Sequence, residues 1–115
     1  MHEPKFRIVL LEEAKDFLDT LPEKTRSKIL YNLWKARITL DKDLFKKLQD
    51  DIWEFRTTYN KIHYRLFAFW DKTNSANTLV IATHGLTKKT NKIPPSELEH
   101  ANTLLKQYFE SKNKK

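Results

Sequence analysis

The pattern of hydrophobic and polar residues divides the chain into a central strand-like region and two helical flanks. Between Ile52 and Pro94, apolar residues alternate with polar ones or run continuously, which is typical of β-strands. On both sides of this region, apolar residues recur every three or four positions, which is typical of amphipathic helices. The pattern therefore predicts a sheet formed by the middle of the chain and covered by helices from its two ends.

The first part of the chain is predicted to form a strand and a helical hairpin. Residues 5–11 alternate and then become fully apolar, which favours a strand that enters the sheet. The period then changes, because apolar residues at helical spacing follow at Ala14, Phe17, Leu18 and Leu21. Pro22 ends this helix and begins the next, since a proline at the first helical position loses no hydrogen bond.

The second helix is predicted to run from residue 22 to residue 39. Its inward face is expected to consist of five apolar residues, namely Ile29, Leu30, Leu33, Trp34 and Ile38. Residues 41–51 are mostly polar, and they are predicted to form a loop or a helical turn.

Three antiparallel strands are predicted next, at residues 52–59, 62–70 and 78–86. A tight turn at Asn60 and Lys61 joins the first two, and a longer turn at residues 71–77 joins the last two. The two-residue period places Glu54 and Arg56 on one face of their strand, and His63 and Arg65 on one face of theirs.

The last strand is predicted to lead through a basic loop into a final helix. Gly85 is the only glycine of the chain, and its place at the strand end predicts a bulge, a positive φ or a backbone that a ligand approaches closely. The helix is expected to begin at Pro94 and Pro95, with Ser96 and Glu99 at capping-box spacing. Its apolar stripe comprises Leu98, Ala101, Leu105 and Tyr108, and residues 111–115 are expected to be a frayed tail. The whole chain, residues 1–115, is thus predicted to be a single α+β domain in the order strand, helix, helix, three antiparallel strands, helix.

Composition narrows the possible functions. The 115 residues carry a formal net charge of +7, which favours a polyanionic partner such as nucleic acid. The absence of cysteine excludes disulfides and thiolate chemistry, and no apolar run is long enough for a membrane span or a signal peptide. A cytoplasmic protein is therefore expected. The four histidines show no metal-site spacing, and no phosphate-binding glycine loop is present, so neither a metal nor a cofactor is predicted.

A group of basic residues in and after the predicted strands is the candidate site. Arg56 and Arg65 come from adjacent strands, and guanidinium groups match phosphate oxygens two at a time. Lys88, Lys89 and Lys92 follow in the loop that leads to the last helix. Each has a purely structural interpretation as well, in which the arginines pair with Glu54 and the lysines form a solvated loop.

The same residues carry a resemblance to a known family. The segments WEFR, YRLF and LVIATHGLTKKTNKIPPSELEHA, within residues 53–101, resemble toxins of the RelE/ParE superfamily, specifically its HigB-like, phage-derived branch. That pattern runs E-h-R, then Y-R, then H-G-F-x-K-K-x-x-K-x-P. The chain departs from it at Leu86, where the family usually has phenylalanine, a change at a packing position.

The resemblance implies a RelE-like fold and a toxin that cleaves messenger RNA on the ribosome without a metal. It implies catalytic roles for Arg56, Arg65, Lys88, Lys89 and His84, and RNA contacts by Lys92, Lys47, Tyr59 and His63. The sequence does not rank Lys88, Lys89, His84 and Tyr59 as general base or acid, because a lysine in a basic cluster and an unperturbed histidine both suit proton transfer.

The resemblance also implies a cognate helix-turn-helix antitoxin, a toxin–antitoxin heterotetramer and a monomeric free toxin. The docking surface for the antitoxin is expected to be either the basic site or the first helices. Two other functions stay open at this point. One is a non-catalytic inhibitor of DNA gyrase of the ParE type, and the other is an RNA-binding module without catalysis.

Overall fold

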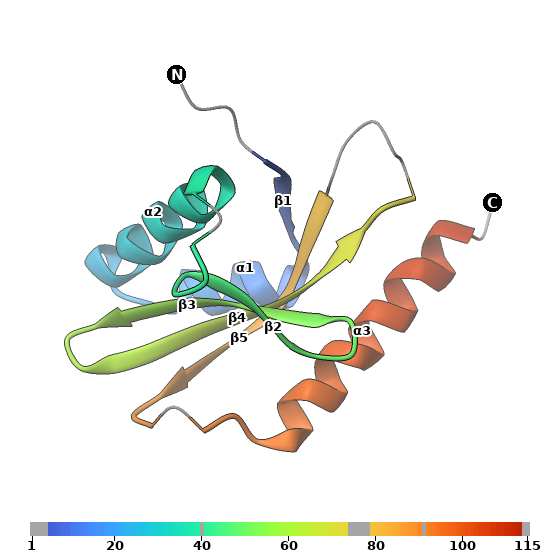
Figure 1. The fold of residues 1–115 in the computed structure, drawn as a ribbon. Helices are drawn as coiled ribbons and strands as arrows, with labels where there is room; N and C mark the ends of the chain where they lie inside the picture. The colour runs from blue at the N-terminus through green and yellow to red at the C-terminus, as the bar shows by residue number, and fades with distance from the viewer. Residues whose placement is uncertain (1–4, 40, 74–78, 91, 114–115) are drawn as a thin grey trace.

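The computed structural model describes residues 5–39, 41–73, 79–90 and 92–113. Figure 1 shows α1 and α2 on one side of a twisted sheet and α3 on the other. None of the described helices is both long and apolar enough to cross a membrane. In chain order, the elements are β1 (Arg7–Leu10), α1 (Glu12–Asp19), α2 (Glu23–Thr39), β2 (Phe45–Gln49), β3 (Ile52–Tyr59), β4 (Ile62–Asp71), β5 (Leu79–Lys88) and α3 (Pro95–Asn113).

The five strands form one mixed sheet in the order β1-β5-β4-β3-β2. β1 runs parallel to β5, and the three other pairings are antiparallel. This arrangement confirms the predicted α+β class with a mainly antiparallel sheet. The turn predicted at residues 71–77 lies largely outside the described residues, and so does the predicted strand start at residue 78.

β2 is a strand that the sequence pattern did not predict, and the expectation of a loop or helical turn at residues 41–51 is wrong. Phe45 is buried and stacks on Phe55 at a centroid distance of 4.2 Å, which anchors the segment to β3. Lys46 and Lys47 lie in the same short strand, and lysines are common in edge strands because they oppose pairing with other chains. Because these charged residues interrupt the apolar pattern, hydrophobic alternation did not predict the strand.

The predicted inward face of α2 is correct in part. Ile29 and Leu33 are buried, but Leu30 and Trp34 are 43% and 52% exposed, so their assignment to the core is wrong. The helix is rotated because polar residues take part in its buried face. Nδ2 of Asn32 donates a hydrogen bond of 3.0 Å to Oγ1 of Thr57 on β3, and this satisfies both buried side chains.

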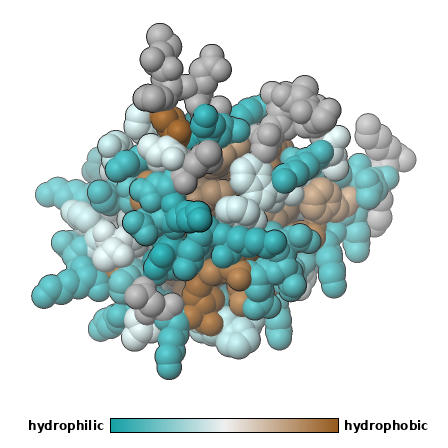
Figure 2. Space-filling view, in the orientation of Figure 1, coloured by the Kyte–Doolittle hydropathy of each residue, from teal (hydrophilic) through white to brown (hydrophobic). Residues whose placement is uncertain are grey.

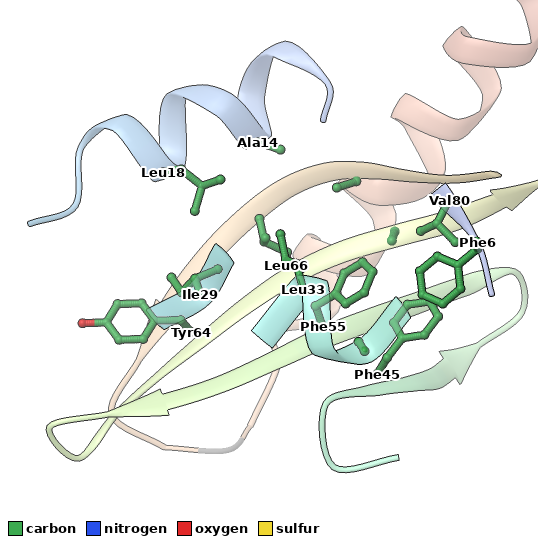
Figure 3. Packing of buried hydrophobic residues seen from close by; sticks show 13 residues of the cluster. Phe6, Ala14, Leu18, Ile29, Leu33, Phe45, Phe55, Tyr64, Leu66 and Val80 are labelled. Atoms are coloured by element: carbon green, nitrogen blue, oxygen red, sulfur yellow. The ribbon is translucent and has the colours of Figure 1, made fainter. Parts of the chain in front are cut away.

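Two apolar clusters hold the layers together, one on each face of the sheet. Figure 3 shows the larger cluster, in which the rings of Phe6, Phe45 and Phe55 lie together while Ala14 and Leu18 point from α1 towards the sheet. The smaller cluster lies under α3 and contains Ile52, Phe67 and Ala101, with Leu98 and Leu105 packed against it. The stripe predicted for the last helix is thus confirmed.

The turns and ends of the elements agree with most local expectations. Asn60 and Lys61 have φ values of 52° and 65°, which confirms the tight turn between β3 and β4. The pairing of β4 with β5 is irregular between Leu66 and Ala68, and this confirms a bulge near Gly85, whose φ is not positive. The group that closely approaches Gly85 is the ring of Phe17.

α3 begins at Pro95, which confirms its predicted start, but its cap and its end differ from the prediction. Ser96 lies inside the first turn and is not the N-cap. It continues to Asn113, so residues 111–113 are helical and are not a frayed tail. Lys112 explains this extension, because its Nζ lies 2.8 Å from Oδ2 of Asp71 at the end of β4.

Candidate nucleic-acid interface

The sheet face that α3 covers also carries two cross-strand rows that contain polar residues. Strand pairing aligns Arg56 directly with Arg65, and Arg65 with Leu86 on β5. Two residues further towards the β3–β4 turn, a second row contains Thr58, His63 and Lys88. Because alternate residues of a strand share a face, both rows lie on the same side as Phe67, which packs under α3. The predicted common faces for Glu54 with Arg56 and for His63 with Arg65 are confirmed.

Glu54 holds the two arginines in place. Nε of Arg65 lies 3.1 Å from Oε1 of Glu54, and Nε of Arg56 lies 3.8 Å from Oε2. Nη1 of Arg65 also donates a hydrogen bond of 3.2 Å to the carbonyl oxygen of Tyr64. The Arg65 and Glu54 side chains are each 3% exposed, whereas that of Arg56 is 28% exposed. The trio therefore carries one net positive charge, and Arg56 presents it to solvent.

Burial acts on the protonation of this trio. It raises the pKa of Glu54, while the charges of Arg65, Arg56 and Lys46 act in the opposite direction. Burial also lowers the pKa of Arg65, against the effect of Glu54. A guanidinium nevertheless stays protonated in proteins, so Arg65 is a fixed buried cation. Glu54 is shared between this cation and Arg56.

His63 and Lys88 are paired across β4 and β5 at the open end of the sheet. Nδ1 of His63 shares a hydrogen bond of 3.1 Å with Oγ1 of Thr58. Within the described part of the chain, Nε2 of this imidazole has no hydrogen-bond partner. Both His63 and Lys88 are half-buried, and Figure 1 shows the β3–β4 turn beside the end of β5. An imidazole and an ammonium group thus stand next to the arginine pair.

Lys89 and Lys92 are exposed on the segment that joins β5 to α3. The residue between Thr90 and Lys92 lies outside the described part. The segment follows Lys88, which pairs with His63 in the row next to Arg56 and Arg65. Figure 2 shows that hydrophilic residues cover most of the side seen in Figure 1.

His84 shares the face of the arginines, but α3 covers it. Its Nε2 lies 3.1 Å from Oε1 of Glu97 in the first turn of α3, and its Nδ1 lies 3.0 Å from Oγ1 of Thr83. Its ring packs against Phe67 at 4.9 Å. Burial lowers the pKa of His84, although its hydrogen bond to the Glu97 carboxylate opposes this shift. The imidazole therefore connects the sheet to α3 and is 6% exposed.

Tyr59 and Lys47 are not brought to this face. Tyr59 packs on the opposite cluster with Phe55, and Lys47 is paired with Trp53, whose side chain also belongs to that cluster. The strand period alone separates Tyr59 from Arg56, whereas the face of Lys47 depends on the register of β2 with β3. Two residues that the sequence did not indicate, Lys46 opposite Glu54 and Thr58 opposite His63, lie on the face of the arginines. Glu54 was predicted from the sequence only as a structural partner.

Among the residues that the structure describes, no three or more His, Asp or Glu side chains are grouped so that they could hold a metal ion. The chemistry of this face comes from two guanidinium groups, an imidazole and lysines. Such a set can bind a phosphodiester, balance added negative charge on it and transfer protons.

Comparison with known proteins supplies the family context. A family model described as "Phage derived protein Gp49-like (DUF891)" matches residues 16–106. The comparison with curated proteins gave no match. The chain is similar in structure to a chain from the crystal structure of the toxin–antitoxin complex RelBE2 of Mycobacterium tuberculosis, with a TM-score of 0.56 and 16% sequence identity. The alignment covers 78% of this chain and 100% of that one, and it confirms the predicted RelE-like fold.

Proposed function

The chain belongs to the Gp49-like family of phage-derived proteins, and on this premise we propose that it is the toxin of a type II toxin–antitoxin system that cleaves messenger RNA on the ribosome. We place it in the HigB-like branch of the RelE/ParE superfamily, which the segments around Arg56, Arg65 and Lys88 resemble. The cross-strand pair Arg56–Arg65 beside His63 and Lys88 carries this proposal.

Cleavage requires stabilisation of a phosphorane. The ribose 2′-hydroxyl attacks the neighbouring phosphorus, the bond to the 5′-oxygen breaks, and the products are a 2′,3′-cyclic phosphate and a 5′-hydroxyl. Negative charge builds on the non-bridging oxygens during this step. The half-exposed guanidinium of Arg56 can donate two parallel hydrogen bonds to these oxygens. Arg65 lies behind it and adds a fixed charge, since Glu54 and the Tyr64 carbonyl hold it in place.

Two protons must also move. One leaves the 2′-hydroxyl and one reaches the 5′-oxygen. His63 is suited to one of these transfers because Thr58 holds its Nδ1 and so fixes the position of the ring beside the arginine pair. Lys88 and Lys89 are the candidates for the other, and Lys92 contacts the RNA backbone. His84 supports the site through α3, and Tyr59 and Lys47 have no role on this face.

The charge and fold suit the partners that this function requires. A net charge of +7 favours association with ribosomal and messenger RNA in the cytoplasm. The neutralising partner is a helix-turn-helix antitoxin encoded beside the chain, in a heterotetramer of two toxins and two antitoxins. An acidic antitoxin segment would complement the basic surface.

The test is a short induction of the wild-type chain and of Arg56→Ala and Arg65→Ala in a bacterial host, with 5′ ends mapped across the messenger RNA. Codon-phased cuts that decrease by two to three orders of magnitude in Arg56→Ala are expected, as for the loss of one transition-state donor. Lys106→Ala, on an exposed position of α3, is the control and should cut like the wild type. Growth arrest with intact messages would reject the ribonuclease and favour the gyrase inhibitor. RNA binding without any cleavage would favour the non-catalytic module.

A further inference from the structure

In the described part of the chain, most of the exposed large hydrophobic side chains belong to one helix. Among the described residues, the large hydrophobic side chains that are exposed are Val9, Leu30, Tyr31 and Trp34, with 39% to 52% exposure. Val9 belongs to β1, and the three others belong to α2. Tyr31 and Trp34 are in ring contact at 5.9 Å. By alternation, Val9 points to the opposite face of β1 from Ile8 and Leu10, so the exposed apolar surface on the α2 side consists of Leu30, Tyr31 and Trp34. Such a surface indicates an interaction site.

A groove runs between these two elements. It has a volume of about 280 Å³, and its apolar walls include Ile8 and Leu10 from β1 with Leu30 and Trp34 from α2. Arg7 and Arg37 are its charged lining residues, and no acidic side chain lines it. We refer to it as the β1–α2 groove. An occupant should therefore combine aliphatic side chains with a carboxylate.

One wall of the groove is an open strand edge. β1 is the outermost strand of the sheet, and in the described part of the chain it pairs only with β5. The amide of Leu11 donates to the carbonyl of Ala82 on β5, so by alternation the backbone groups of Ile8 and Leu10 point away from the sheet. Such an edge is a template for a further strand. The α2 contact at Lys5, whose amide donates to the Arg37 carbonyl, covers only the chain before β1.

The charge of α2 indicates the composition of that strand. Between Glu23 and Thr39, the helix carries one acidic residue and five basic ones, which are Lys24, Arg26, Lys28, Lys35 and Arg37. Nζ of Lys28 lies 5.7 Å from the centre of the exposed Tyr31 ring. A protein segment with alternating aliphatic residues and flanking carboxylates is complementary to this surface in its apolar character and in its charge.

We propose that the β1–α2 groove is the docking site of the antitoxin, through an extended acidic segment that adds a sixth strand to the sheet along β1. This proposal rests on the proposed function for the identity of the partner, and on the groove and the open edge for the place. RNA is a poorer occupant, because the open backbone edge of β1 offers pairing that a peptide can complete and a nucleic acid cannot.

The location has a consequence for inhibition. β4 and β3, which carry Arg65 and Arg56, are the third and fourth strands from the β1 edge. The groove also belongs to the α2 side of the sheet, opposite the arginine face. The bound segment thus leaves Arg56 uncovered, and the antitoxin inhibits by preventing the toxin from entering the ribosome.

The direct test is amide hydrogen exchange of the full chain, alone and with the protein encoded by the adjacent open reading frame. Slowed exchange at Ile8 and Leu10 and along residues 28–37, with unchanged exchange at residues 54–65, is the expected result. Protection on residues 54–65 and the lysine segment, with none on β1, would overturn the proposal. Failure of the adjacent protein to bind would also overturn it. Protection of α2 by ribosomes, with the adjacent protein bound elsewhere, would assign the surface to RNA.

Variants separate this proposal from the proposed function. Trp34→Arg and Leu30→Arg should weaken binding of the adjacent protein at least tenfold in calorimetric titration. Gln107→Arg adds the same charge at an exposed position of α3 and should bind like the wild type. The ribonuclease assay is independent, since Trp34→Arg should keep its cleavage pattern and escape neutralisation. If the chain does not cleave messenger RNA but the adjacent protein slows exchange at β1, only the ribonuclease proposal is rejected. If the chain cleaves and both groove variants bind the adjacent protein like the wild type, only the docking site is rejected.

Discussion

The ring of Phe17 in α1 occupies the space that a Cβ atom on Gly85 would need. Three ring carbons of Phe17 lie well inside van der Waals distance of that position. Gly85 has no positive φ, so its lack of a side chain serves packing and not backbone conformation. The contact brings α1 directly onto β5 at the bulge, where the strand turns towards Lys88.

We expect Gly85→Ala to destabilise the fold by about 1–3 kcal/mol, because a rigid aromatic ring and the added methyl group compete for one space. The midpoint of urea unfolding measures this. Thr87→Ala, at an exposed position of the same strand, is the matched control and should change stability little. Combining Gly85→Ala with Phe17→Leu should restore part of the loss, since residues in contact are not additive. Equal stability of Gly85→Ala and the wild type would show that α1 moves freely on β5.

The fold was largely predictable because its main strands and helices have clear periods. Alternation located β3, a nearly continuous apolar run located β4, which is buried on both faces, and helical spacing located α3. β2 was missed because its charged edge residues, Lys46 and Lys47, interrupt the apolar pattern that Phe45 begins. The face of α2 was misassigned because Asn32 is buried through a partner 25 residues away, Thr57, which no local pattern shows.

The candidate site was predictable only in part. The resemblance located Arg56, Arg65 and the lysines, and the strand period explained why the arginines share a face. The sequence could not show that Arg65 is buried behind Arg56, nor that α3 covers His84, because both depend on how distant elements pack. The sequence also could not show that Glu54 is the shared partner of two arginines, because this role follows from the register of β3 and β4.

Asp71 should stabilise the attachment of α3 in a pH-dependent way. Its Oδ2 accepts hydrogen bonds of 2.6 Å from Oη of Tyr108 and 2.8 Å from Nζ of Lys112. Burial alone would raise the pKa of Asp71, but these bonds and those from Thr73 lower it far below its ordinary value of 3.8. A lowered pKa gives stability that is present above the ordinary value and is lost as the pH falls through the folded value.

Asp71→Asn should therefore cost about 2 kcal/mol at neutral pH, as for a hydrogen-bonded charged group. The difference in the free energy of unfolding between the variant and the wild type should decrease below about pH 4, as measured by denaturant unfolding. Tyr108 gives a second readout, because burial and the bond to Asp71 raise its pKa to about 12. Its ultraviolet titration should move towards lower pH in the variant. A constant gap across the acid range would contradict the assignment.

His84 should contribute to stability rather than to chemistry. Burial lowers its pKa, so the unfolded chain takes up a proton before the folded chain does. The stability that depends on neutral His84 is thus present above the ordinary value of 6.5 and decreases as the pH falls below it. His84→Gln should flatten this dependence and retain cleavage by the folded fraction. Complete loss of cleavage in a stably folded His84→Gln would return His84 to the catalytic group.

Removing Glu54 should disturb both stability and the site. Glu54→Gln leaves Arg65 buried without its carboxylate and opposite the like charge of Arg56, and breaking a buried pair in this way costs about 3–5 kcal/mol. Thermal unfolding should show the loss, and added phosphate should recover more of it than chloride at equal ionic strength, because phosphate can bind the partly exposed guanidinium of Arg56 when the Glu54 charge is absent. Equal recovery by both salts would show that the arginines are not accessible to phosphate.

Lys88 and Lys89 should act through the RNA backbone. Each contact between a lysine and a phosphate releases a counterion, so binding to the ribosome weakens as salt is added. In a plot of the logarithm of the association constant against the logarithm of salt concentration, the slope should be shallower by about one unit in Lys88→Ala and in Lys89→Ala. Lys106→Ala on α3 is the control and should keep the wild-type slope. Their substitution should leave unfolding midpoints nearly unchanged, since Lys89 is exposed and Lys88 ends its strand. Wild-type slopes in both variants would remove these two lysines from the interface and leave the arginine pair and Lys92 as the proposed phosphate contacts.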